Sequence, residues 1–287
     1  MFVNCPPWID KEILTYNKVD DIPRHVFDRI NAALIKNQTI EQPLVSVVIP
    51  ALNEELNIIR TLSTLANNIA SFPFEIVVVN NNSTDKTEQV LKQLCVRTVF
   101  QPKPGCGPAR QLGQEAAIGE YILMADADCF YPPGWINQMT NEISREGVSC
   151  VYGGYSFLTE FDNRRLGLKL YEWTRGTLVW IKHFKRPYLN ALGMNMAYVK
   201  KFGLQVGFVE SAIRGEDGRM CFDLMQFGRV VRVRDKSCNV WTSTRTLDKE
   251  GSLLKAFVKR LFIEITRLNQ YFTTMKAHNT KTSKNRR

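Results

Sequence analysis

The sequence predicts an α/β fold, a doubly wound mixed sheet flanked by helices, with a helical extension before it and a basic amphipathic helix after it. Short apolar, β-branched runs at residues 44–49 and 74–79 each stop at turn-forming residues and precede a segment with helical periodicity. Apolar runs without alternation are typical of strands buried on both faces of a mostly parallel sheet. The length of 287 residues allows one large domain or two small ones.

The first elements follow from local patterns. In the extension, Val26, Phe27 and Ile30 recur at helical spacing, which predicts a helix over residues 22–35. The strand at 44–49 ends at Pro50, and apolar positions on one face predict a helix over 54–69. The next elements are then a strand at 74–79, a helix at 85–94, a strand at 96–100, a helix at 109–117 and a strand at 121–125.

The second half of the chain is less regular. We expect strands at 151–157, 230–233 and 239–241, the last two at sheet edges, and helices at 166–181, 217–226 and 251–272. The final helix is basic and carries an apolar face, which favours either a solvated surface or contact with an anionic membrane.

Composition narrows the function classes. A hydrophobic content of 44% and a charged content of 23% disfavour both disorder and a bundle of membrane helices. The net charge of +10 is concentrated in the C-terminal tail, which leaves a solvated tail, an anionic membrane face and nucleic acid as open interpretations. Seven scattered cysteines without a CxxC pair favour a reducing cytoplasm over zinc or disulfide chemistry. No apolar run reaches the roughly 20 residues that span a bilayer, so we expect a soluble or peripheral protein.

The strongest local motif is the segment Asp126-Ala127-Asp128, directly after the predicted strand 121–125. In an extended segment, one intervening residue lets both carboxylates point to the same side. Such hard oxygen ligands suit Mg²⁺ or Mn²⁺, with a diphosphate completing the coordination shell. The alternative is a strand that ends in a polar turn.

Three further segments are candidates because ligands bind beyond the carboxyl ends of strands in open α/β sheets. Glu216-Asp217 offers a general base or, alternatively, favourable charges at a helix start. Polar residues at 50–54 and 80–85 could contact a base and a ribose, or serve as turn and capping residues. Arg110 is expected in the first turn of a helix, where its charge opposes the dipole and suggests an anionic or base partner.

Taken together, these motifs resemble glycosyltransferase family 2, the inverting group with the GT-A fold. The resemblance covers about residues 44–245. Its six motifs, in order, are Pro-Ala-Leu-Asn-Glu at 50–54, Val-Asn-Asn-Asn-Ser-Thr-Asp at 79–85, Ala-Arg-Gln-Leu-Gly at 109–113, Gly-Glu-Tyr-Ile at 119–122 leading to Asp126-Ala127-Asp128, Gly-Met-Asn at 193–195, and Glu216-Asp217.

The resemblance implies a role for each motif. Nucleotide-sugar contacts would come from Pro50, Ala51, Glu54, Asn80, Asn81, Arg110, Asp126 and Ala127. The same resemblance implies a divalent Mn²⁺ or Mg²⁺ held by Asp126 and Asp128. Asp217, with Glu216 beside it, would deprotonate the acceptor hydroxyl. Gly193 and Asn195 would shape the acceptor side.

The predicted domains follow from the same comparison of motifs. Residues 1–42 would form the extension, 43–246 the GT-A domain and 247–287 the basic helix and tail. Within the GT-A domain, 43–128 would bind the nucleotide and 129–246 the acceptor.

The expected reaction is a single sugar addition in the synthesis of cell-envelope glycan, exopolysaccharide or glycolipid, because the processive Q-x-x-R-W pattern is incomplete at residues 226–230. The acceptor would be a glycan or a lipid-linked molecule, and the protein would lie in the cytoplasm or peripherally on the inner face of the plasma membrane. We expect no specific nucleic-acid partner. The family often has two aspartates where this chain has Asn80 and Asn81, so the choice between UDP and GDP donors stays open.

Other hypotheses remain at this stage. A nucleotidyltransferase of related fold would carry a glycine- and lysine-rich loop after the first strand, which this chain lacks at 50–54. A degenerate nucleotide-sugar-binding protein is the second alternative. His183, beside Lys182 and Lys185, is interpreted either as a phosphate or metal contact or as a plain surface histidine.

Overall fold

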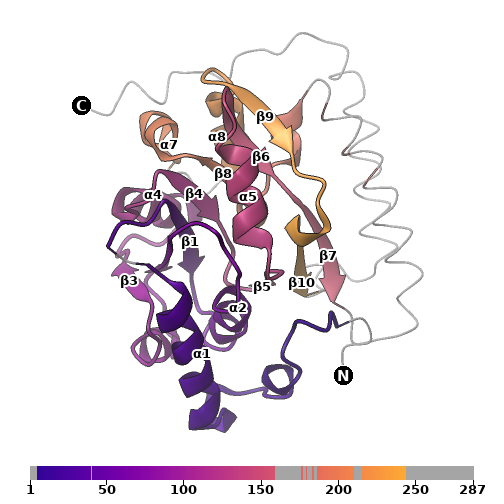
Figure 1. Cartoon of the computed structure of the whole chain (residues 1–287). Helices are drawn as coiled ribbons and strands as arrows, with labels where there is room; N and C mark the ends of the chain where they lie inside the picture. The colour runs from indigo at the N-terminus through magenta and orange to yellow at the C-terminus, as the bar shows by residue number, and fades with distance from the viewer. Residues whose placement is uncertain are drawn as a thin grey trace, which may run out of the picture.

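The computed structural model describes residues 5–39, 41–158, 176, 179, 183, 186–209 and 215–243. Within these ranges the chain forms a seven-stranded sheet with helices on both faces and a three-stranded sheet beside it (Figure 1). These ranges include only residues 176 and 179 of the predicted helix over 166–181. They include no residue of the predicted helix over 251–272 or of the region 247–287.

The large sheet has the strand order β3-β2-β1-β4-β8-β6-β9. Strand β8 runs antiparallel to both of its neighbours, and the other pairings are parallel. In chain order the strands are β1 (Val45–Ala51), β2 (Phe74–Asn80), β3 (Arg97–Phe100), β4 (Tyr121–Met124), β6 (Val148–Tyr152), β8 (Met196–Val199) and β9 (Arg229–Arg232). The central strands β1 and β2 are almost fully buried, which explains their unbroken apolar sequences.

Two apolar cores cover the two faces of this sheet. Alternate residues of β1 contribute to each, with Val47 and Ile49 in one core and Val48 in the other. The first face is covered by α1 (Arg24–Asn37), α2 (Asn57–Leu65), α3 (Thr87–Leu91) and α5 (Trp135–Ile143). The second face is covered by α4 (Cys106–Ala116), α7 (Lys200–Val206) and α8 (Glu216–Leu224).

The small sheet consists of β5 (Cys129–Phe130), β10 (Asn239–Ser243) and β7 (Gly154–Leu158), in that order. Strand β10 pairs antiparallel with β5 and parallel with β7. The prediction of an edge strand at 239–241 is therefore wrong, because β10 has a partner on each side. The predicted strand at 151–157 is in fact two strands, β6 in the large sheet and β7 in the small one.

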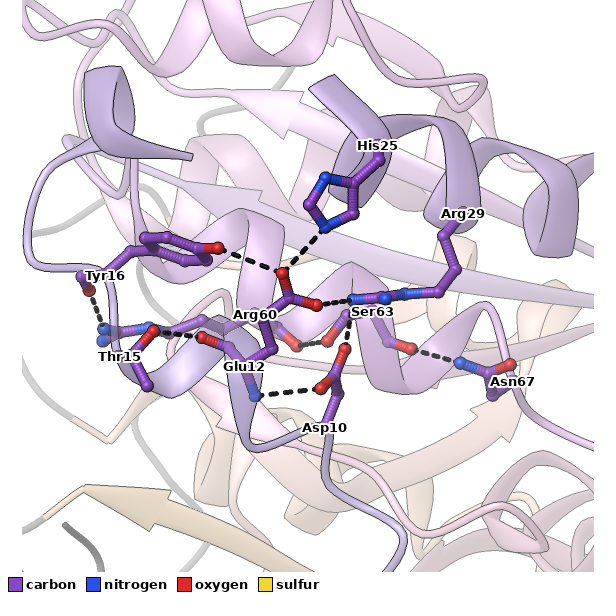
Figure 2. Close-up of polar contacts among 9 residues, drawn as sticks. All are labelled: Asp10, Glu12, Thr15, Tyr16, His25, Arg29, Arg60, Ser63 and Asn67. Carbon is purple, nitrogen blue, oxygen red and sulfur yellow. Dashed lines mark hydrogen bonds and ion pairs between the residues drawn. The ribbon is translucent and has the colours of Figure 1, made fainter. Parts of the chain in front are cut away.

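The N-terminal extension contains α1 and, before it, a segment that packs against α1 and α2. It carries two short 3₁₀ turns, η1 (Glu12–Leu14) and η2 (Val19–Asp21). Figure 2 shows Glu12 accepting hydrogen bonds from His25, Arg29 and Tyr16. In the same view Arg60 of α2 donates to the carbonyl oxygen of Tyr16 at 2.7 Å. Ile9 of this segment packs against Phe130 and Leu158 of the small sheet.

Most predicted elements of the first half are confirmed with shorter or shifted ends. Among the α-helices and strands of the described ranges, α5, α7, β5 and β8 were not predicted. Helix α5 had a readable signal, since Trp135, Ile136, Met139 and Ile143 are buried at helical spacing. None of the helices in the described ranges combines the length and the apolarity needed to cross a bilayer.

Candidate active site

Asp126 and Asp128 follow β4 at the edge of the large sheet where β1 and β2 also end. Tyr131 fixes the start of this segment, because its hydroxyl accepts the Asp126 N–H at 2.8 Å and lies 3.0 Å from the Met194 carbonyl oxygen, to which it donates. The hydroxyl of Thr61 donates to the carbonyl oxygen of Ala127 at 2.7 Å. The two carboxylates are therefore carried on a backbone held by side chains from other elements.

Arg110 joins three carboxylates that are far apart in the sequence. Its Nη2 lies 3.2 Å from Asp126 Oδ1, and its Nη1 lies 3.1 Å from Glu216 Oε1. The same Nη1 also donates to Asp217 Oδ1. The side chain of Arg110 is only 5% exposed, and its Nε–H has no hydrogen-bond partner within the part of the chain that the structure describes.

Helix α4 begins at Cys106, so Arg110 lies in the second turn of the helix, one turn later than predicted. Position 110 faces α8, where Glu216 and Asp217 occupy the first turn. A carboxylate in a first turn is stabilised by the positive end of the helix dipole. The sequence motifs at 109–113 and 216–217 are thus in direct contact.

Gly193 leaves the space that this ion-pair network needs. A Cβ atom at this position would lie 2.0 Å from Arg110 Nη2 and 2.7 Å from Asp217 Oδ1. The backbone of Gly193 also acts to lower the pKa of the Asp217 carboxylate. A side chain at position 193 would therefore displace either the arginine or the aspartate.

The loops after β1 and β2 are tied to each other. Asn53 accepts the Thr84 N–H at 2.7 Å through its side-chain oxygen, and Asn80 accepts the Ser83 N–H at 3.1 Å. Asn81 exchanges hydrogen bonds with the backbone of Gly105, each 3.2 Å long. In this structure Asn80 and Asn81 hold turns, and their predicted contact with a base stays a prediction.

The other predicted residues of these loops lie at the same edge. Ala51 is fully buried at the end of β1, and Pro50 beside it is partly exposed. Glu54 accepts a hydrogen bond from Asn57 at 2.6 Å. Pro50 and Ala51 at the end of β1 and Glu54 just beyond it lie at the predicted ligand edge, and a role in binding ribose or base remains a prediction.

Asn195 has a structural environment. It is 2% exposed and donates to the carbonyl oxygens of Gly154 at 2.6 Å and Cys238 at 2.8 Å. Its side-chain oxygen accepts the Trp135 indole N–H at 2.8 Å. Both amide donors are used inside the protein, so this residue joins the two sheets next to the site, and the predicted contact with an acceptor remains untested.

The chain matches a known protein family. The family description "Glycosyl transferase family 2" matches residues 46–199, which is more than half of the chain. The chain belongs to glycosyl transferase family 2.

Among characterised relatives, this family 2 chain is similar to glycosyltransferase AglE of Haloferax volcanii, with 30% identity over 124 residues, 40% of each chain. It is also similar to glucosyl-3-phosphoglycerate synthase of Mycolicibacterium smegmatis, with 29% identity over 121 residues, 39% of this chain and 40% of the relative. The matched segment thus spans well under two thirds of these relatives.

Solved structures support the GT-A fold of this family 2 chain. TarS of S. aureus, residues 1–349, superposes with a TM-score of 0.55 and 18% identity over 81% of this chain and 75% of that one. The mannosyltransferase PcManGT of Pyrobaculum calidifontis, solved with GDP-Man and Mn²⁺, gives a TM-score of 0.52 and 17% identity over 76% of this chain and 62% of that one. The fold prediction is confirmed.

Burial and neighbouring charges shift the pKa values of the ionisable side chains in the site. Burial raises the pKa of Asp217 to about 6, although the Arg110 guanidinium acts in the opposite direction. Burial also raises the pKa of Asp126, with Arg110 again opposing and the Asp128 carboxylate adding to the rise. Burial acts to lower the pKa of Arg110, but the carboxylates of Asp217 and Asp126 outweigh it and raise the value further.

The donor atoms present fit a hard divalent cation. Asp126 keeps 34% of its side chain exposed, and Asp128 is also partly exposed, so both are open on one side. The described residues contain no group of three or more side chains that could hold a metal by themselves. Two carboxylates on one short segment suit Mg²⁺ or Mn²⁺ when ligand oxygens supply the remaining positions.

Two features of the site had no signal in the sequence. Tyr131 connects the Asp126 backbone to Met194, yet an aromatic residue shortly after a strand is common in any packed core. The Arg110–Asp217 pair joins residues 107 positions apart. No local pattern predicts such a contact.

Proposed function

We propose that this chain transfers a sugar from a nucleoside-diphosphate sugar to an acceptor hydroxyl, with inversion at the anomeric carbon. The observation that carries the proposal is the position of Arg110, which contacts both Asp126 and Asp217. One guanidinium therefore contacts both the Asp126 carboxylate, which is suited to a metal–diphosphate group, and the Asp217 carboxylate, which is suited to a general base. A reaction centre between them would be within reach of both.

In the proposed reaction, Asp217 accepts the proton of the acceptor hydroxyl. The hydroxyl oxygen forms a bond to the anomeric carbon, and the bond from that carbon to the diphosphate oxygen breaks. A Mn²⁺ or Mg²⁺ held by Asp126 and Asp128 would neutralise charge on the diphosphate. Arg110 keeps Asp217 oriented, and Glu216 shares the same nitrogen.

The donor base remains open between uracil and guanine. Among similar structures, PcManGT is a complex with GDP-Man, and TarS is a complex with UDP-GlcNAc. Asn80 and Asn81 would lie near the base, and Glu54 near the ribose. The proposal also keeps Gly193 on the acceptor side, a glycan or lipid-linked acceptor, and a cytoplasmic or peripheral location.

The test is a thermal-shift panel of UDP-, GDP-, CMP- and dTDP-sugars, with and without Mn²⁺. We expect one nucleotide class to raise the melting temperature in a metal-dependent manner, because ligand above its Kd stabilises the folded chain. Asp128→Asn should lose the metal-dependent part of the shift, and Asp217→Asn should keep the full shift but lose transfer. No shift with any nucleotide in the folded wild-type protein would contradict the proposal.

A further inference from the structure

The hydroxyl of Tyr131 lies between the ends of β4 and β8, which are neighbours in the large sheet. The two strands pair antiparallel, and their last pair on this side is Met124 opposite Met196. The same register, continued two residues beyond each strand, would place Asp126 opposite Met194. The ladder stops before it reaches them.

A direct hydrogen bond would join these two residues if the ladder continued. In antiparallel strands, every second pair of opposite residues exchanges N–H···O=C bonds. The N–H of Lys200 donates to the carbonyl oxygen of Glu120 at 2.8 Å, so this pair, next to the other end of the ladder, is of the hydrogen-bonded kind. Steps of two residues along the register lead from this pair to Asp126 and Met194. A continued ladder would therefore bond the Asp126 N–H to the Met194 carbonyl oxygen.

The Tyr131 hydroxyl takes the place of that bond. It accepts the Asp126 N–H at 2.8 Å and donates to the Met194 carbonyl oxygen at 3.0 Å, whereas the Asp126 carbonyl oxygen is farther away, at 3.5 Å. A hydroxyl carries one donor and two acceptor sites, so it can make both bonds at once. Two hydrogen bonds in series replace one, and the strand ends are held apart by a hydroxyl group.

Tyr131 is itself held by two helices of the opposite layer. The residue is fully buried, and its backbone N–H donates to the Thr64 hydroxyl of α2 at 3.1 Å. Its ring lies 4.5 Å from the Trp135 ring of α5, centroid to centroid. The Trp135 indole N–H in turn donates to Asn195, the neighbour of Met194. Packing against α2 and α5 therefore determines where the hydroxyl lies.

The two strand ends carry different halves of the candidate site. Asp126 begins the segment suited to a metal and a diphosphate. Gly193, next to Met194, borders the base, because a Cβ atom there would lie 2.7 Å from Asp217 Oδ1 and 2.0 Å from Arg110 Nη2. The separation of the strand ends therefore sets where the first half lies relative to the second.

We propose that Tyr131 is a positioning residue for glycosyl transfer. Its hydroxyl holds the ends of β4 and β8 apart and thereby sets the distance between the Asp126–Asp128 segment and Asp217. This inference rests on the proposed function, since it assigns a role in the same reaction. Tyr131 contacts neither donor nor acceptor in this role.

The variant Tyr131→Phe removes the hydroxyl and keeps the ring against Trp135. The freed Asp126 N–H and Met194 carbonyl oxygen can then bond each other, so we expect the fold to be kept and the strand ends to close. The Thr61 hydroxyl still holds the carbonyl oxygen of Ala127, so the segment itself stays intact. The change therefore alters the spacing of the two halves more than either half.

The matched control is Tyr198→Phe. Tyr198 is also fully buried, lies in β8 and donates its hydroxyl to Gln114 at 3.1 Å. The control thus loses one buried tyrosine hydroxyl from the same strand without changing the contact between Asp126 and Met194. Urea denaturation shows whether both variants are folded before their rates are compared.

The first measurement is Mn²⁺-dependent hydrolysis of the nucleotide sugar that stabilises the wild type in the thermal-shift panel. Water serves as the acceptor: its oxygen bonds to the anomeric carbon, the bond to the diphosphate breaks, and Asp217 takes the proton. We expect Tyr131→Phe to lower kcat at least about tenfold, because small displacements of reacting groups slow a reaction strongly. The KM for the donor and the Mn²⁺ concentration at half of the thermal shift should stay within about twofold of wild type.

Tyr198→Phe should keep kcat within about twofold of the wild-type value. Equal kcat values for the two variants would overturn the role of Tyr131. A loss confined to KM would overturn it as well, because such a loss marks weaker binding and not a changed distance to the base.

Crystal structures of the wild type and both variants provide a measurement that does not depend on activity. In Tyr131→Phe we expect a direct bond of about 2.9 Å from the Asp126 N–H to the Met194 carbonyl oxygen. Strand ends that stay as far apart as in the wild type would overturn the spacing role. Absence of donor stabilisation and of hydrolysis in the folded wild type refutes the proposed function instead.

Discussion

Arg110 shares its two terminal nitrogens among Asp126, Glu216 and Asp217 in a nearly closed site. A buried ion pair adds little net stability, but removing one partner leaves the others as unpaired buried charges. We therefore expect Arg110→Met to reduce the free energy of unfolding by about 3–5 kcal/mol in urea denaturation at pH 7. Arg110→Lys keeps the positive charge but lacks the planar guanidinium with its several N–H donors. We expect it to retain more stability than Arg110→Met.

The difference in stability between Arg110→Lys and Arg110→Met measures the contribution of the positive charge at position 110. Equal stability of Arg110→Met and wild type at pH 7 would show that the three carboxylates do not depend on the arginine. Arg24→Gln is a suitable control because its only described ion pair, with Asp28, is exposed on α1.

Asp217 gives the reaction a pH dependence. Burial raises its pKa to about 6, and the proposed base works only when ionised. We expect kcat/KM to fall by about tenfold per pH unit below this value, measured in buffers of constant ionic strength. A rate that stays flat down to pH 4 would show that another group is the base.

The same shift affects folding with a defined sign. The folded chain holds the Asp217 proton more tightly than the unfolded chain, because the pKa rises from 3.8 to about 6. The stabilising contribution of this proton is full below pH 3.8 and is lost as the pH rises through about 6. The ionised carboxylate at neutral pH therefore depends on Arg110 for compensation.

At the scale of elements, helix α4 lies close to β1 and β2 because Gly113 has no side chain. A Cβ at this position would lie 2.3 Å from Val48 Cγ1 and 3.1 Å from Val79 Cγ2. We expect Gly113→Ala to destabilise the protein by about 1–3 kcal/mol through overpacking. The same change should also weaken transfer, because α4 carries Arg110.

A double-mutant cycle checks the assignment. Val48→Ala removes the closest contacting atoms, so in the Val48→Ala background Gly113→Ala should cost less than it does in the wild type. Additive free energies of unfolding for the two changes would contradict the proposed contact between α4 and β1.

At the scale of the whole molecule, the segment before α1 contacts α1, α2 and the small sheet through both apolar and polar side chains. Ile13 is fully buried in the main core, whereas the Glu12–Arg29 ion pair is exposed (Figure 2). Ile13→Ala should reduce the free energy of unfolding by about 2–5 kcal/mol, the usual cost of a large-to-small change in a core.

The exposed ion pairs provide the comparison. Arg29→Gln should change the unfolding midpoint much less than Ile13→Ala does, and its effect should disappear in high salt because exposed charges are screened. If Arg29→Gln is the more damaging change at high salt, the extension is held by its polar network and not by its core contacts.

Local chemistry in the sequence determined the buried strands β1, β2 and β4, the helices between them, and the two carboxylates after β4. Each depends on neighbours within a few residues, through β-branched apolar runs, helical spacing and turn residues. The order of motifs then determined the family. Tertiary structure alone decided that Arg110 pairs with Asp217, that Gly193 leaves room for the pair, and that β10 lies between β5 and β7. These contacts join residues far apart in the chain. The order of the strands within the sheets brings them together, and local periodicity does not encode that order.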